Sequence, residues 1–418
     1  MKLKALFFIL KILFATSFVV PALAQTVSIP DAGLSAAIHE ALGKSGPLTQ
    51  QDMLGLTNLD ASRRNVSNIT GLETARNLAS LHLEINHLTN VSIPTALTNL
   101  SVLDLSSNPL NSFSAPGALS KLASLTIESC ALTNLTLAAT LTSLTNLDVE
   151  GNNLAIFNLP STVTNLIFLD LGFNLFSNFS LPDGLTKLDS FYFAGNPLTN
   201  VTFPPGLSGM SELNVSQSLL THFTLPTGMT NLSELDLSFN QLTNVTLPGD
   251  LMSLSELDLD FNRLSSLNFP SNLASLSFLH LRANLFTNFN LPASLTALTY
   301  LDVSDGPLRA ISLPSTGLSH LATLRIAGNT NLTSLTLPAG LTNLTALFLA
   351  GNQLTNIVLP SDMNHLDSLN LGGNRLTSLT LPAGLINLTG LFVQVNQLTN
   401  LTLPPDLTRL TASGQEAA

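Results

Sequence analysis

LSELDLSFNQLTNVTLPGDLMS, residues 232–253, is one copy of a phrase that the chain repeats from about residue 56 to residue 411. In general form the phrase reads L-x-x-L-x-L-x-x-N-x-L-T-N-L-T-L-P-x-G-L-T-N. Its asparagine position recurs sixteen times, at intervals of 22 residues apart from two intervals of 23. A fixed period of this length indicates that the chain stacks one structural unit many times.

The first half of the phrase, L-x-x-L-x-L, alternates apolar and polar residues with the period of a β-strand. This pattern predicts a leucine-rich repeat solenoid of the α/β-horseshoe family, with about sixteen rungs and a parallel concave sheet. The second half, L-T-N-L-T-L-P, also alternates and has no helical period. It predicts short extended or strand segments on the convex side, a β-rich solenoid and weak curvature.

The asparagine that follows each strand is expected to satisfy buried backbone groups of its own and adjacent rungs. Cys130 occupies one of these positions and is interpreted as a small buried residue rather than a reactive thiol. Phe173, Phe239 and Phe261 stand just before this position. We expect these three side chains to pack at the corners of their rungs.

The N-terminus divides into two parts ahead of the repeats at 56–411. Residues 1–24 combine Lys2 and Lys4 with an apolar run and an Ala-Leu-Ala cleavage site, which predicts a secretory signal peptide. Residues 25–55 are expected to form a helical cap, with Asp31 as N-cap, Gly43 as terminator and Thr49 capping a second turn. Leu34, Ile38 and Leu42 would form its buried face. Residues 412–418 are expected to be a disordered tail.

Charge and cysteine content narrow the possible partners and compartments. Without residues 1–24 the chain has 12 basic and 26 acidic residues, a net charge of about −14. Such a protein is a poor candidate for nucleic acid or for insertion into an anionic membrane. A single cysteine excludes an intrachain disulfide. We expect the protein to lie outside the cell, at the cell surface or in the periplasm. We also expect it to be a monomer.

The segments IPDAGLSAAIHEALGKSGPLTQQDMLGLTNLDAS (29–62) and NITGLETARNLASLHLEINHLTN (68–90) lead directly into the 22-residue repeats. This arrangement resembles the start of internalin-type and related bacterial leucine-rich repeat proteins. The resemblance covers almost the whole chain after residue 24. It implies a secreted bacterial protein that binds proteins or other surface molecules through its concave sheet.

Outward positions of the concave sheet are the candidates for ligand contact, because core packing does not dictate them. Three consecutive rungs present Glu212, Glu234 and Glu256 at one site, with Asp236, Asp258 and Asp260 beside them. Like charges about 5 Å apart repel each other unless a partner neutralises them. The cluster is either a patch for a basic ligand or a divalent cation, or a solvated face that keeps the protein soluble.

Four aromatic residues form two further candidate clusters on the same sheet. Tyr192 and Tyr300 are the only tyrosines, and Phe168 and Phe278 precede them by about one rung. Exposed aromatic side chains are typical anchors of protein interfaces and of sugar stacking. The alternative is that they pack laterally on neighbouring rungs and shield the sheet.

No catalytic motif is recognisable in the chain. Its seven histidines are scattered, and neither a zinc-protease helix, a nucleophile elbow nor a phosphate-binding loop occurs. We therefore expect no enzyme activity, no cofactor and no dedicated metal site. The favoured hypothesis is an exported, non-catalytic protein that binds a macromolecule, most plausibly a protein, on its concave face. Glycan binding at the cell envelope and a structural role without a specific ligand are the alternatives.

Overall fold

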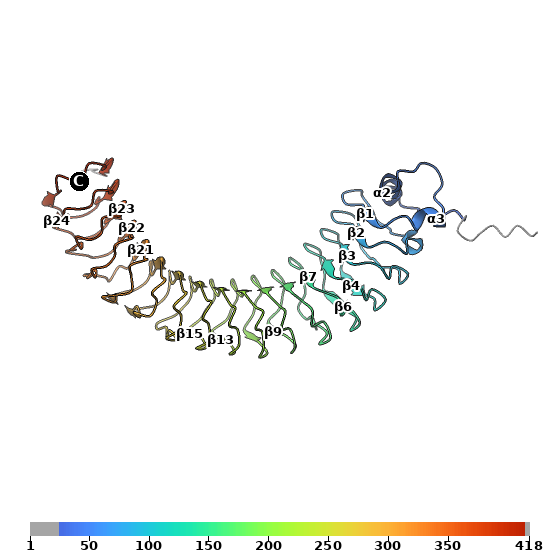
Figure 1. The fold of residues 1–418 in the computed structure, drawn as a ribbon, viewed down its shortest axis with the longest axis horizontal. Coiled ribbons are helices and arrows are strands. Elements are labelled where there is room, and N and C mark those ends of the chain that lie inside the picture. The colour runs from blue at the N-terminus through green and yellow to red at the C-terminus, as the bar shows by residue number, and fades with distance from the viewer. Residues whose placement is uncertain (1–24, 414–418) are drawn as a thin grey trace, which may run out of the picture. The chain divides into compact units, whose positions relative to one another are not determined.

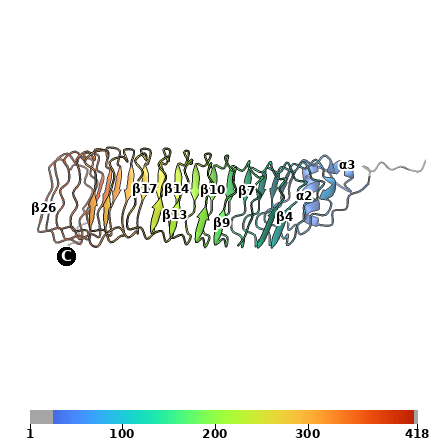
Figure 2. The same cartoon turned by 90° about the horizontal axis from the view of Figure 1, so that it is seen from below.

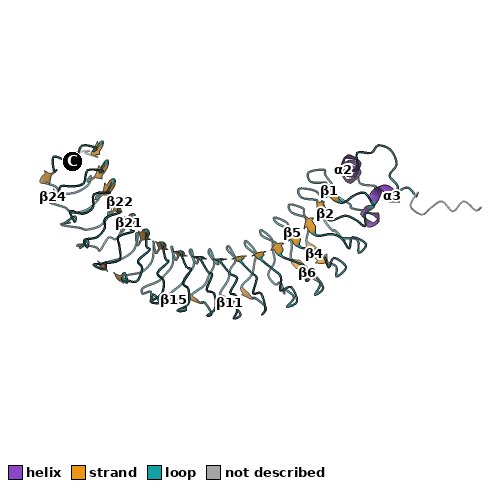
Figure 3. Cartoon of the chain, viewed as in Figure 1, coloured by secondary structure: helices purple, strands orange, loops and turns teal. Residues whose placement is uncertain are grey.

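The computed structural model describes residues 25–413, which fall into two compact units that are divided between Leu166 and Ile167. The predicted signal peptide and residues 414–418 lie outside the described residues. Within residues 25–413, no helix combines the length and the apolar character that crossing a membrane requires. Helices occur only near the N-terminus of the described chain, and short strands joined by turns make up the rest (Figure 3).

The first unit begins with a small helical cap formed by α2 (Ala32–Leu42) and α3 (Gln50–Met53). Asp31 caps α2 by accepting a 2.9 Å hydrogen bond from the Leu34 amide, and Gly43 ends the helix in the left-handed conformation at φ 61°. Leu34 and Ile38 are buried as expected, but Leu42 is only half-buried, and Ala37 takes the third buried position. A helix period places residues 34, 37 and 38 on one face, whereas residue 42 lies at its margin.

The cap is joined to the first rung by a carboxylate that serves two segments. One Asp31 oxygen caps α2, and the other accepts hydrogen bonds from the backbone amides of Ser67 and Asn68. Burial alone would raise the pKa of Asp31, but these hydrogen bonds outweigh it and lower the pKa. The short helix α3 has a capping box, in which Thr49 and Asp52 bond each other's backbone amides. A 3₁₀ turn, η2 (Leu72–Thr74), follows later in the first rung, before β2.

The main sheet of the first unit is parallel, and each strand pairs with the strand one repeat later. In spatial order its strands are β1 (Asn58–Asp60), β2 (Ser80–His82), β3 (Val102–Asp104), β5 (Ser124–Thr126) and β7 (Asn146–Asp148). On the opposite side of the rungs, β4 (Ser112–Ala115) pairs with β6 (Asn134–Leu137).

The second unit continues the same plan with twelve parallel main-sheet strands. They are β8 (Phe168–Asp170), β10 (Ser190–Tyr192), β12 (Glu212–Asn214), β14 (Glu234–Asp236), β16 (Glu256–Asp258), β17 (Phe278–His280), β19 (Tyr300–Asp302), β21 (Thr323–Arg325), β22 (Ala346–Phe348), β23 (Ser368–Asn370), β25 (Gly390–Phe392) and β27 (Ala412–Ser413). The prediction of about sixteen rungs is confirmed. β27 extends the sheet by two residues into the segment expected to be a disordered tail, because its backbone pairs with β25.

The convex side of the second unit carries strands in separate pairs, seen as a second row beside the main-sheet strands (Figure 2). The pairs are β9 (Asn178–Ser180) with β11 (Asn200–Thr202), β13 (His222–Thr224) with β15 (Asn244–Thr246), β18 (Asn288–Asn290) with β20 (Ala310–Ser312), and β24 (Ser378–Thr380) with β26 (Asn400–Thr402). Taken alone, the second unit bends towards its main sheet (Figure 1), more than the weak curvature expected. Unjoined pairs let the convex side spread, whereas the main sheet holds rungs about 4.8 Å apart.

The core follows from the alternation within each rung. Every main-sheet strand of residues 58–392 buries its central residue, as Leu235 does in β14, and leaves both neighbours facing out. The asparagines form a buried ladder beneath the turns. Asn240, for example, donates to the Val215 carbonyl of the preceding rung at 2.9 Å and to its own Leu237 carbonyl at 3.2 Å. Its side-chain oxygen accepts from the Leu220 amide at 3.0 Å, so the expected role of the asparagine is confirmed.

The rungs of Cys130 and Ser218 lack the asparagine, and they show which hydrogen bonds it provides in the other rungs. Cys130 is half-buried rather than fully buried as expected. Its sulfur lies 3.6 Å from the Leu105 carbonyl oxygen, and burial raises the pKa of its thiol. Neither Cys130 nor Ser218 has a side-chain amide oxygen that could accept a hydrogen bond from the preceding rung. The leucine amides of the preceding rungs, Leu110 and Leu198, instead donate to the backbone carbonyls two residues earlier, each at 2.8 Å.

Candidate functional site

The acidic residues singled out from the sequence come together in the second unit. Glu212, Glu234 and Glu256 lie directly opposite one another in adjacent strands, at the first position of β12, β14 and β16. Asp236 and Asp258 occupy the third position of their strands on the same outward face. With Tyr192 these side chains line a cavity of about 190 Å³, which we call the acidic groove.

Burial and the crowding of like charges raise the pKa of several carboxyl groups on this surface. Burial, followed by repulsion from Glu212 and Glu256, raises the pKa of Glu234. Burial also raises the pKa of Asp258, although the Asp260 amide donates a hydrogen bond to it at 2.8 Å. Asp260 has its pKa raised to about 6, by burial and then by the charge of Asp258. The groove therefore holds more negative charge than its own surroundings neutralise.

Tyr192 closes one end of the acidic groove. Its hydroxyl donates a hydrogen bond to the Glu212 carboxylate, and burial together with this bond raises the pKa of Tyr192 to about 12. The Phe168 ring centroid lies 5.7 Å from that of Tyr192. The contact is diagonal, because Phe168 is paired with Ser190 and Tyr192 is paired with Asp170.

Phe278 and Tyr300 form a second aromatic pair beyond the other end of the groove. They are direct partners in adjacent strands, with ring centroids 6.3 Å apart, and 42% of Phe278 is exposed. The ring of His280 lies 4.8 Å from that of Tyr300, and its Nε2 is 3.9 Å from a Glu256 oxygen. All nine predicted contact residues thus face outward on one sheet, six in the groove wall and three beside it.

One member of this surface, His280, was not identified from the sequence. Asp260 and His280 join Asp258 in a set whose possible metal-ligand atoms all lie within 4.8 Å of one another. The spacing of these residues could have predicted the cluster. Residues i and i+2 of one rung, here Asp258 and Asp260, share a face with residue i+22 of the next rung, here His280. This pattern was obscured because the histidines are scattered along the chain.

The phenylalanines before the asparagines are more exposed than expected. Phe173, Phe239 and Phe261 are 49%, 52% and 39% exposed, so the interpretation as corner packing is wrong for much of each ring. Phe239 and Phe261 stack on each other, nearly parallel, with centroids 4.4 Å apart. All three adopt φ values of 49–54°, a conformation that favours glycine. We call these residues the aromatic edge; it borders the main sheet near the acidic groove.

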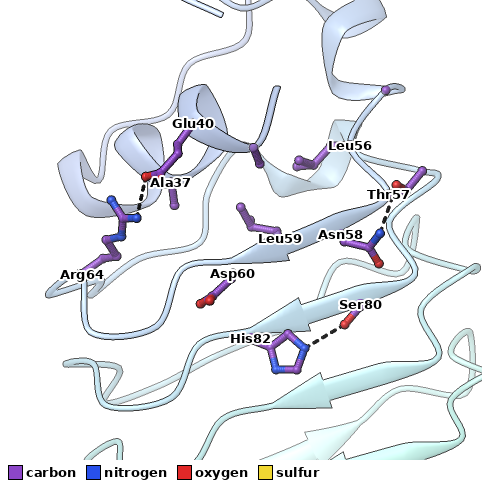
Figure 4. A pocket seen from close by; sticks show the side chains of 12 residues that line it. Ala37, Glu40, Leu56, Thr57, Asn58, Leu59, Asp60, Arg64, Ser80 and His82 are labelled. Carbon is purple, nitrogen blue, oxygen red and sulfur yellow. Dashed lines mark hydrogen bonds and ion pairs between the residues drawn. The ribbon is translucent and has the colours of Figure 1, made fainter. Parts of the chain in front are cut away.

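A larger cavity, of about 610 Å³, lies in the first unit between α2 and the strands β1 and β2. We call it the N-terminal pocket (Figure 4). Arg64 forms an ion pair with Glu40 at 2.6 Å on one side, while Asp60 and His82 lie on the sheet side. The sequence did not predict this pocket. Its walls come from the helical cap and from the first two rungs, and no local sequence pattern shows that these segments meet.

Comparison with known proteins supports the repeat architecture. A family model described as BspA type Leucine rich repeat region matches residues 62–167, 172–291 and 327–414, in six copies. No curated protein matches the sequence. Among solved structures, the functional domain of InlJ from Listeria monocytogenes, which includes a cysteine ladder, shares 24% identity at a TM-score of 0.72. That alignment covers 85% of this chain and 78% of that one.

Two further structures show the same fold in other settings. YopM, a leucine-rich effector protein from Yersinia pestis, shares 22% identity at a TM-score of 0.61, covering 91% of this chain and 92% of that one. A chain of the Toll–Spätzle complex of Drosophila shares 24% identity at a TM-score of 0.61, over 79% of this chain and 49% of that one. At these identities the likeness describes the fold, and a protein complex is among the structures that share it.

Proposed function

The chain belongs to the family of BspA type leucine-rich repeat regions, and from this premise we propose that it is an exported, non-catalytic protein that binds a basic protein partner. The partner would lie on the main sheet of the second unit, with cationic side chains in the acidic groove. Phe168 and Tyr192 at one end, and Phe278 and Tyr300 at the other, would supply apolar contacts.

The observation that carries this proposal is the glutamate ladder. Glu212, Glu234 and Glu256 are held in register at adjacent positions, where like charges repel. Among residues 25–413, no lysine or arginine forms an ion pair with any of the three glutamates; the Nε2 atom of His280 lies 3.9 Å from an oxygen of Glu256. Repulsion among the three carboxylates opposes folding, whereas a cationic partner would remove this repulsion and be attracted by the negative charge.

Protein is favoured over glycan by the state of the aromatic rings. Sugar stacking needs a freely exposed ring face. Tyr192 is half-buried with its hydroxyl engaged by Glu212, and Tyr300 is half-buried between Phe278 and His280. These rings suit apolar contacts at the rim of a larger interface better than an isolated sugar platform.

Selection of binding peptides tests the proposal. A displayed library of random peptides is panned against the chain, against Glu234→Lys and against Asp183→Lys. Glu234 is the exposed centre of the ladder, and Asp183 is an exposed acid in the turn after β9. Both variants change the net charge equally. The wild-type chain and Asp183→Lys should enrich peptides rich in lysine and arginine, and Glu234→Lys should not. Equal enrichment by all three proteins would refute the assignment.

Export is a separate part of the proposal and rests on the sequence of residues 1–24. Mass spectrometry of the protein produced in a bacterial host with a general secretory pathway should give a mature N-terminus at Gln25. A chain that keeps Met1 and stays in the cytoplasm would contradict this part and leave the binding proposal untouched.

A further inference from the structure

We propose that His82, Glu84 and Asp104 in the first unit form a binding site for a divalent transition-metal ion of the zinc class. His82 on β2 and Asp104 on β3 are direct partners in the sheet. Glu84 follows His82 by two residues and shares its outward face. One possible ligand atom from each of the three side chains lies within 4.8 Å of the other two.

Two of the three ligands, His82 and Asp104, are oriented by a second contact. The Nε2 of His82 lies 2.9 Å from the Ser80 hydroxyl (Figure 4), which leaves Nδ1 on the side of Glu84. One Asp104 oxygen accepts a 2.9 Å hydrogen bond from the Ser106 amide, which leaves the second oxygen of the carboxylate. Such outer contacts fix the ring orientation and tautomer of metal-binding histidines and hold ligating carboxylates in place.

Glu84 supplies the observation that points to a cation. Its Oε2 is buried and has no hydrogen-bond partner among residues 25–413. The nearest candidate, Nδ1 of His82, is 4.0 Å away, which is too far for a hydrogen bond. Metal–nitrogen and metal–oxygen bonds of about 2.0–2.2 Å would let one ion contact both atoms across this gap. The ion would also neutralise two carboxylates held close together.

The donor set indicates which ion fits. One imidazole nitrogen with two carboxylates suits zinc and its neighbours, whereas calcium and magnesium favour oxygen ligands alone. Three protein ligands leave a coordination position for water or for a group of a bound partner. His82 also belongs to the wall of the N-terminal pocket. The site lies in the first unit and is therefore independent of the function proposed for the acidic groove.

Calorimetry with zinc tests the site. The set Asp258, Asp260 and His280 occupies the same three positions eight repeats later, so His280→Gln serves as the background that disables it. The metal-free full chain with His280→Gln is titrated with zinc chloride and, separately, with calcium chloride. We expect one zinc ion per chain at micromolar affinity or tighter, and binding of calcium weaker by about 100-fold or more.

Glu84→Gln is the diagnostic variant, because it keeps the size of the side chain and removes its charge. It should weaken zinc binding by about 10-fold or more, and saturating zinc should no longer raise the melting temperature. His82→Gln should act in the same way. Unchanged melting of metal-free Glu84→Gln excludes misfolding as the cause. Absence of zinc binding in the background chain, unaltered affinity in Glu84→Gln, or equal affinity for calcium would each overturn the proposal.

Discussion

The hydroxyl of Tyr192 on β10 donates a hydrogen bond to the carboxylate of Glu212 on β12. This bond links neighbouring rungs across the outward face of the main sheet. It fixes the first glutamate of the ladder and turns the tyrosine ring into the end wall of the acidic groove. A surface residue with one partner of this kind is better ordered for binding than one that rotates freely.

The Tyr192 phenol should resist ionisation. Burial and the Glu212 carboxylate raise its pKa to about 12, and Tyr300 is the only other tyrosine. In a Tyr300→Phe background, absorbance at 295 nm should show little phenolate at pH 10.5, where a free tyrosine is about three-quarters ionised. Adding Glu212→Gln should bring ionisation to lower pH. Normal titration with Glu212 intact would show that the hydrogen bond is not formed in solution.

Loss of a ladder asparagine should destabilise the second unit strongly. Asn240→Ala removes three donated hydrogen bonds and one accepted bond, and it takes away the side-chain partner of the Val215 carbonyl and of the Leu220 amide, whereas the Leu237 carbonyl still accepts from Asn262. We expect a loss of about 2–4 kcal/mol in the free energy of unfolding, measured by urea denaturation.

Adding an asparagine to a rung that lacks one should raise the free energy of unfolding. Ser218→Asn restores an amide at a position that lacks one, and it allows the Leu198 amide to bond the next rung as other rungs do. A gain of about 1 kcal/mol is expected. If Asn240→Ala is tolerated and Ser218→Asn destabilises, the ladder does not have the role assigned to it.

Stability should fall between about pH 4.5 and pH 7. Glu128 has its pKa raised to about 7 by burial and by Asp148, and Asp260 has its pKa raised to about 6. A folded carboxyl with a raised pKa keeps its proton where the unfolded chain has lost it, so folding binds protons in this window. Each group should contribute no more than about 1 kcal/mol once solvent screening is considered.

At lower pH, a further fall in pH reduces the stability of the fold. Hydrogen bonds lower the pKa of Asp31, so the stability that this group contributes is present above about pH 4 and is lost as pH falls through its folded pKa. Melting temperatures across pH 3–8 should therefore peak near pH 4–5, and Asp260→Asn should flatten the decline above the peak. A melting temperature that rises steadily from pH 5 to pH 8 would contradict this.

Phe261 on the aromatic edge should be dispensable for folding. Glycine adopts its φ of 54° without strain, which offsets the loss of stacking on Phe239 and of the Arg282 contact. Phe261→Gly should change the free energy of unfolding by about 1 kcal/mol or less. Phe191→Ala, in the core, should cost about 3–5 kcal/mol and serves as the comparison. Similar losses at both positions would show that the edge is part of the core.

Most of the fold could be predicted because each rung repeats a local rule. Alternation placed Leu235 and its equivalents inside, and the regular period placed Glu212, Glu234 and Glu256 in register. Outside the strands the sequence revealed the asparagine ladder, but it did not reveal where the cap meets the rungs or how the turns orient their side chains. The N-terminal pocket needs the cap and two rungs together, and the exposure of Phe239 depends on a left-handed turn that phenylalanine rarely adopts.

The central claim is that the acidic groove binds cationic side chains of a protein partner. Its most direct test is the affinity of one lysine-rich peptide, selected on the wild-type chain, for wild type, Glu234→Lys and Asp183→Lys at two salt concentrations. We predict that Glu234→Lys weakens binding by about tenfold or more, that Asp183→Lys stays within about twofold, and that salt weakens binding to the wild type. Equal losses in both variants would contradict the claim, because net charge rather than the groove would then explain the binding.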